Sequence, residues 1–368
     1  MSVKRQPWLG VTATGLIIVL ALAFIAPWSW PSFGGWVSFV MMCGIPFAIV
    51  VGAYWRGEEP SAIARLRQPV RGLAYLLLTV VVAAVVALVL WLTVGGRVSP
   101  PLPMLAQATI LSVVTSFWLT IMWGGWPFSL IRNRLVSGIA LLVGTYAIAG
   151  VIFVVLFDYA WLKGAPVYDA SLDPGGLFDA WDATVAAVTA LAVMFLVLHL
   201  DLWPLRRSST VMRQPVLGLV WTVLVLVVGV VLYYLGTRTF GMTPPSFLVT
   251  VPIPFIFGSV VLLNMLDGSL TARLHSPLRG VASAVAAMVV GSVLALVYRL
   301  VMPLVTGELP SGPPTFDAEL WLANALLAVT FPFLAFYGDF FQLWPLAKPP
   351  AVDIGTETES GDLADAAR

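Results

Sequence analysis

The chain has 368 residues, of which 60% are hydrophobic and only 10% are charged. Because a soluble domain carries about 25% charged residues, this composition argues against a water-soluble fold and for a membrane protein. The net charge of +1 gives no basis for binding nucleic acid, and one cysteine with two histidines leaves no internal disulfide and no ordinary metal cluster, so no cofactor is expected.

Long uncharged stretches predict about ten membrane-spanning helices, since one span needs roughly 20 apolar residues. Residues 6–55 contain no charged residue and are long enough for two spans, which the Pro- and Gly-containing segment 28–35 divides. The predicted spans are residues 9–27, 36–55, 72–95, 105–129, 135–159, 181–205, 215–236, 246–267, 280–303 and 319–346. The expected fold class is therefore an all-α, polytopic integral membrane protein.

Basic residues predict the orientation of these spans, because Lys and Arg concentrate in short cytoplasmic loops. Of the 19 basic residues, only Arg97, Lys163, Arg238 and Arg299 fall on the side opposite the N-terminus. We therefore expect a multi-pass protein of the plasma membrane with both termini in the cytoplasm.

The odd-numbered spans begin with related motifs. Arg-Gln-Pro occurs at residues 5–7, 67–69 and 213–215, and each time a glycine comes three residues after the proline. Residues 275–280 are a looser copy of this opening, and residues 132–138 are a still looser one without proline. Pro suits the first turn of a helix, and Gly permits close helix packing. A cleaved signal peptide at the N-terminus is the less favoured interpretation, because the first span shares this opening.

The even-numbered spans share Trp-Pro endings at residues 126–127, 203–204 and 344–345. Together these patterns predict five two-helix repeats within a transmembrane bundle, residues 1–348, followed by a disordered acidic cytoplasmic tail, 349–368. The repeats comprise residues 5–56, 67–131, 132–206, 213–270 and 275–346, to within a few residues. A two-span unit keeps its orientation, so the repeats would be related by an axis along the membrane normal, and a ring-like bundle is the simplest arrangement.

Polar residues near the cytoplasmic ends of even spans are the main site candidates, because ionisable groups in a membrane are costly. They are Asp201, Gln342 and Asp267 beside the span endings, Asn264 and Asp339 one turn deeper, and His199. They could form a ring around a vestibule for a proton, a cation or a basic substrate, or each acid could simply pair with a nearby arginine. Asp339, the deepest of the three acids, is expected to be the most consequential.

At the outer ends, Asp158, Arg238 and Arg299 occupy similar positions in their repeats and are candidates for a belt of ion pairs, or for single side chains that reach the interface. Prolines at 46, 252, 254 and 332 interrupt even spans, which is typical either of transport sites or of packing kinks.

No nucleotide-binding, metalloprotease or serine-hydrolase motif occurs in the sequence, so no catalytic or metal-ligating residue is assigned and an enzyme is not favoured. The hypothesis is a permease or channel for an unidentified small solute, in contact with the lipid bilayer. Two alternatives stay open: a non-catalytic partner of another membrane subunit, and a membrane-embedded lipid-modifying enzyme. A continuous polar or aromatic-lined cavity would distinguish the first hypothesis.

Overall fold

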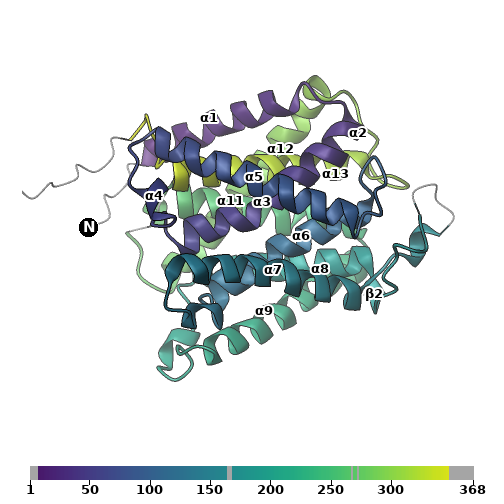
Figure 1. The fold of residues 1–368 in the computed structure, drawn as a ribbon. Helices are drawn as coiled ribbons and strands as arrows, with labels where there is room; N and C mark the ends of the chain where they lie inside the picture. The colour runs from purple at the N-terminus through teal and green to yellow at the C-terminus, as the bar shows by residue number, and fades with distance from the viewer. Residues whose placement is uncertain (1–6, 164–167, 267, 272, 348–368) are drawn as a thin grey trace, which may run out of the picture.

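The computed structural model describes residues 7–163, 168–266, 268–271 and 273–347. The prediction of ten spans is confirmed, because ten helices in these residues are long and apolar enough to cross a membrane. They run side by side in one bundle (Figure 1). The predicted cytoplasmic tail lies outside the described residues.

The odd-numbered spans are nearly continuous helices. They are α1 (Pro7–Ile25), α5 (Val70–Leu92), α7 (Arg134–Leu156), α9 (Val216–Tyr234) with the π-helical turn η7 (Leu235–Thr239), and α12 (Leu278–Val305).

The even-numbered spans are mostly composites of α-helical and π-helical segments. They are α2 (Trp30–Ser32), η1 (Phe33–Val37), α3 (Ser38–Ile49) and η2 (Val50–Tyr54); α6 (Pro103–Phe117) and η3 (Trp118–Met122); α8 (Ala180–His199); α10 (Pro244–Thr250), α11 (Pro252–Val260) and η8 (Val261–Met265); and α13 (Asp317–Ala323), η10 (Asn324–Thr330), α14 (Phe331–Ala335) and η11 (Phe336–Phe340).

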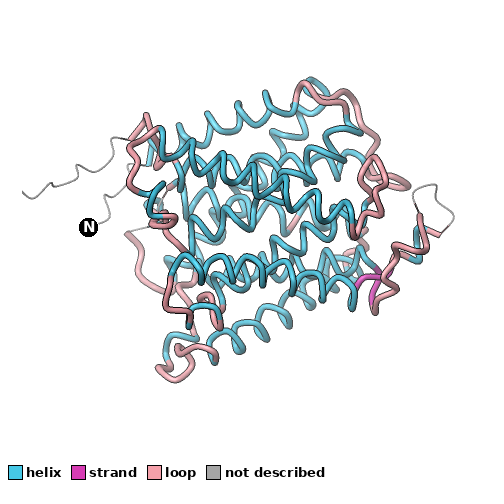
Figure 2. Tube along the Cα trace, in the orientation of Figure 1, coloured by secondary structure: helices cyan, strands magenta, loops and turns pink. Residues whose placement is uncertain are grey.

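Short elements occur in the connections, where Figure 2 shows mainly loops. A helix, α4 (Ser61–Ala64), precedes α5, and β1 (Phe157–Asp158) pairs in parallel with β2 (Phe178–Asp179). Single 3₁₀ turns are η4 (Phe128–Leu130), η5 (Ala160–Leu162), η6 (Leu205–Arg207) and η9 (Ser269–Thr271).

Three predicted helix ends were too late. Spans four, six and ten were expected to reach residues 129, 205 and 346, but they end at Met122, His199 and Phe340. The chain leaves each helix through two consecutive residues with positive φ, which come before the Trp-Pro pair. Such left-handed residues end a helix by turning its last carbonyls toward local amides, so the Trp-Pro pairs lie beyond the helices.

The ten spans form two layers that differ in burial. In the even spans 61–72% of the most apolar segment is buried inside the protein, whereas in the odd spans the share is 22–33%. The even spans are therefore the inner helices, and the odd spans form an outer layer that exposes valine and leucine side chains where lipid would contact them.

The inner helices form a closed ring in chain order. α3 contacts α6, α6 contacts α8, α8 contacts α10 and α11, and α11 contacts η10. The ring closes because η10 and α14 of the last span also contact α3 of the first hairpin. Each outer helix packs between two inner spans: α7, for example, contacts α6, and also α3 with its extension η2.

The outer helices meet the ring through equivalent glycines. A Cβ atom built at Gly72 would lie 2.5 Å from the Phe341 ring, and one at Gly138 would lie 2.2 Å from Nε1 of Trp55. The same crowding occurs between Gly10 and Met265, Gly218 and Trp123, and Gly280 and the backbone of His199 and Leu200. In all five cases the glycine contacts the end of the inner span two hairpins earlier in the ring.

The glutamines of two Arg-Gln-Pro motifs also make equivalent contacts. The Gln68 side chain donates to the carbonyl of Phe340 at 2.7 Å, and the Gln214 side chain donates to the carbonyl of Met122 at 2.9 Å. Each glutamine also accepts from the amide of its glycine, Gly72 or Gly218. The five-hairpin repeat stays a prediction, and these recurring contacts are the kind that it would produce.

Candidate functional site

The ring axis is filled by apolar side chains. All five inner spans contribute to a cavity of about 40 Å³, which we call the axial cavity. Its lining includes Met42 of α3, Phe117 of α6, Leu191 of α8, Ile256 of α11 and Phe331 of α14. The Phe117 and Phe331 rings are 5.9 Å apart. A space of this size holds about one water molecule, so the axis is nearly closed at this level.

A second, polar pocket of about 360 Å³ lies on the N-terminal side of the membrane, between the end of α8, η8, the following loop and the start of α12. We call it the His199 pocket. It brings together two of the predicted site residues, His199 and Asp201, with Ser283 and Arg279 of α12. The predicted candidate Asp267 neighbours this loop in sequence but lies outside the described residues.

His199 is held in one tautomer by two serines from neighbouring spans. The Ser259 hydroxyl donates to the carbonyl of Phe255 at 2.7 Å, so it can only accept from the imidazole. Nε2 of His199 therefore carries the proton and donates to Ser259 at 3.0 Å. Nδ1 is left as the acceptor for the Ser283 hydroxyl, 2.8 Å away.

This chain of hydrogen bonds links α8, α11 and α12, and it leaves a serine hydroxyl next to an unprotonated ring nitrogen. Such a pair could transfer a proton, as a nucleophile does to its base. Asp201 does not orient the histidine, because its carboxylate forms an ion pair with Arg206. The pairing of an acid with a nearby arginine, one of the two interpretations of the sequence, is thus observed at Asp201.

The other inner-span candidates lie apart from this pocket. The Asp339 side chain packs against Gly52, where a Cβ would be 2.4 Å from its Oδ2, so it lies between the last and the first inner spans. Asn264 is exposed in η8, and Gln342 follows η11. Asp201 and Gln342 share a backbone conformation, with φ of 54° and 53°, and occupy the same position after their helices.

The outer candidates also lie on separate elements. Asp158 belongs to β1 and accepts from the amide of Ala160 at 2.8 Å, whereas Arg238 is exposed in η7 and Arg299 is exposed in α12. In the described part of the chain no salt bridge joins these three residues.

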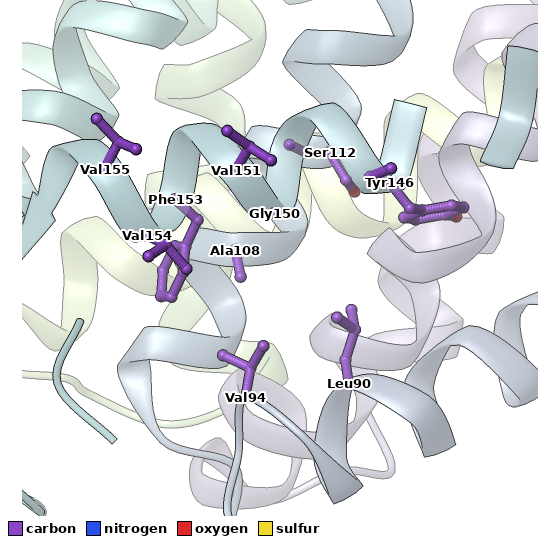
Figure 3. Close-up of a pocket in the computed structure, with 12 residues that line it drawn as sticks. Leu90, Val94, Ala108, Ser112, Tyr146, Gly150, Val151, Phe153, Val154 and Val155 are labelled. Carbon is purple, nitrogen blue, oxygen red and sulfur yellow. The ribbon is translucent and has the colours of Figure 1, made fainter. Parts of the chain in front are cut away.

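A third space, the α5–α7 groove, faces outward between two outer helices (Figure 3). It has a volume of about 480 Å³ and an apolar lining that includes Leu90 of α5, Val94 just after it, Ala108 of α6, and Gly150 and Val154 of α7. Small residues of α6 and α7, such as Ala108 and Gly150, leave space for the groove, and its position suits lipid chains or another helix.

The sequence did not single out Ser259, Ser283 or Arg279 as part of a site. Ser259 and Ser283 lie 60 and 84 residues after His199, and only the packing of α8 against α11 and α12 brings the three together. Ser and Thr are so common in membrane helices that their presence alone gives no signal.

Among the described residues, no group of three or more His, Cys, Asp or Glu could hold a metal ion. The fold defines the protein as a polytopic α-helical membrane protein with an inner ring of five spans. No protein-family model, curated protein or solved structure matches the chain.

Proposed function

We propose that the protein is a permease or channel whose path follows the axis of the inner ring. The observation that carries this proposal is that all five inner spans line one small cavity on that axis. A ring of helices around a narrow apolar constriction is a known way to gate permeation, because such a constriction loses its water. The structure would then correspond to a closed state.

The lining of the axial cavity favours a small, uncharged solute. Its residues are all apolar, so a hydrated ion would lose its water there without gaining a polar partner. Next to Phe117, the hydroxyl of Ser116 is buried and has no hydrogen-bond partner in the described part of the chain, and the same holds for Thr120 one turn further along the span. A rearrangement of this span could offer these hydroxyls to a solute.

The inner spans also have the irregular backbones that a gate would need. Four of the inner spans finish with a π-helical turn, and these turns lie on the side of the membrane where α1 begins. In the span made of α10 and α11, the two helices are separated at Val251, just before Pro252. π-Helical turns break the regular hydrogen-bond ladder and often occur at functional sites. The continuous outer helices would keep the bundle intact while these segments move.

Flux through proteoliposomes tests the proposal. We expect liposomes with the purified protein to take up glycerol faster than empty liposomes after an osmotic step, as followed by light scattering. The double variant Phe117→Ala, Phe331→Ala should be severalfold faster than the wild type, because it removes the two rings that close the axis.

The matched control is Phe153→Ala, which removes a similarly buried ring from the cluster beside α7 and away from the axis. It should leave the glycerol rate at the wild-type level. If wild type and double variant are both folded and both equal empty liposomes, the path does not exist.

A role as the partner of another membrane subunit is the second candidate. The α5–α7 groove supports it, because small residues such as Ala147 and Gly150 let a neighbouring helix approach closely. This role predicts that neither the wild type nor the double variant conducts glycerol, so the same experiment separates the two functions. A lipid-modifying enzyme is the third, and it would rest on the Ser283–His199 hydrogen bond.

We also propose that the protein lies in the plasma membrane with both termini in the cytoplasm. The distribution of the 19 basic residues supports this orientation. A reporter fused after Ala347 should report the cytoplasm, and one inserted at the exposed Gly175 should report the opposite side. Both reporters on one side would contradict the five spans between these two positions, and exchanged sides would contradict the orientation.

A further inference from the structure

The His199 pocket occupies a place that aromatic rings fill in three of the other four hairpins. In three hairpins the outer-helix glycine lies against an aromatic side chain at the end of an inner span: Gly72 against Phe341, Gly138 against Trp55, and Gly218 against Trp123. Gly280 instead meets the backbone of His199 and Leu200. The inner span α8 also ends without a π-helical turn. With no ring at its end, space remains between α8 and α12.

The lining of this pocket is amphipathic. Ser276 and Ser283 supply hydroxyls, and Leu198, Leu263 and Leu274 supply apolar surface. Because α12 is an outer helix, the pocket lies toward the edge of the bundle. Leu270 and Leu278, the sequence neighbours of the lining residues Thr271 and Arg279, are 55% and 61% exposed. A ligand in the pocket would therefore touch both polar groups and the apolar edge of the bundle.

The charge around the pocket is positive. Arg279 lines it, and the exposed Arg273 lies on the loop that forms one wall. The acid in the lining, Asp201, is already balanced by Arg206. Even when the sequence neighbour Asp267 is counted, the arginines leave an excess of positive charge.

We infer that the His199 pocket binds the phosphate headgroup of an anionic phospholipid, with Arg279 as the main contact and the leucines against the acyl chains. Arginine suits phosphate because its planar guanidinium donates two parallel hydrogen bonds. Basic pockets between membrane helices on the side rich in Lys and Arg are typical headgroup sites. Free phosphate has the same chemistry, but it would gain nothing from the leucines.

Native mass spectrometry of the full-length protein in detergent tests this site. Titration with phosphatidylglycerol should give one adduct that forms at lower lipid concentration than any adduct of phosphatidylcholine. Arg279→Gln should weaken this adduct about fivefold, since one basic residue near a lipid surface contributes on the order of 1 kcal/mol. Arg279→Lys keeps the charge but loses the planar guanidinium, so its affinity for phosphatidylglycerol should lie between those of the wild type and Arg279→Gln.

The matched control is Arg132→Gln, which removes an exposed arginine on the same side of the membrane, away from the pocket. It should leave the first adduct unchanged. Equal weakening by Arg132→Gln and Arg279→Gln would overturn the site, and so would equal binding of the two lipids. Displacement of the lipid by millimolar inorganic phosphate would show that the pocket takes free phosphate instead. The permeation proposal is untouched by any of these outcomes.

Discussion

Alanine in place of Gly291 is expected to destabilise the folded protein by about 2–3 kcal/mol, and Gly258→Ala by a similar amount. A Cβ at Gly291 would lie 1.7 Å from the carbonyl oxygen of Pro254, and one at Gly258 would lie 1.8 Å from the carbonyl oxygen of Ala287. Both oxygens belong to the backbone, so they cannot rotate away, and α11 and α12 would have to separate. The better helix propensity of alanine, at most about 1 kcal/mol, is too small to compensate.

Thermal unfolding of the purified variants in detergent measures this effect. Gly150→Ala in α7 and Gly15→Ala in α1 are matched controls, because a Cβ at either position meets no atom within 4 Å. They should leave the unfolding midpoint unchanged or raise it slightly. If all four variants shift the midpoint alike, the close contact between α11 and α12 is not as described.

The ten spans could be predicted from the sequence because their physical cause is local. A helix must be apolar over the thickness of the bilayer, and that requirement is visible in uncharged stretches such as residues 73–96, which contain most of α5. The division into inner and outer layers could not be predicted in the same way. Lipid is as apolar as a protein core, so exposed Val80 and buried Ala83 of α5 look alike to a hydropathy pattern.

Helix ends were harder to predict than helices. The Trp-Pro pair at 203–204 predicts the end of a span, but the helix has already ended at His199. The cause is the left-handed conformation of Asp201 and Leu202. Asp is one of the residues that adopt this conformation more readily, which gives Asp201 a structural reason for its position in addition to any role in a site.

The candidate site could be predicted only in part. His199 is predicted as a candidate because it is a polar, ionisable residue near the cytoplasmic end of an even span. Its hydrogen-bond partners could not be identified, since contacts between distant hairpins depend on the order of helices in the ring. The same limit applies to Asp339, whose neighbour Gly52 comes from the other end of the bundle in sequence.

The closure of the inner ring between its first and last hairpins is the central claim, because a path along the axis requires it. A disulfide between positions 52 and 339 tests it most directly. A Cβ at Gly52 would lie 3.3 Å from the Cβ of Asp339, close to the 3.5–4.5 Å of ordinary disulfides. The variant Gly52→Cys, Asp339→Cys is made with Cys43→Ala, so that no other thiol can react.

A protease site inserted between α8 and α9, at residues 208–212, allows the chain to be cut into two halves after mild oxidation. On a non-reducing gel we expect most of the protein to remain full length, and on a reducing gel we expect two fragments. The control pair Gly150→Cys, Asp339→Cys, again with Cys43→Ala, combines an outer-helix position with the same partner and should give two fragments on both gels. If the pair at 52 and 339 also separates on the non-reducing gel, the first and last inner spans are not neighbours and the ring is not closed.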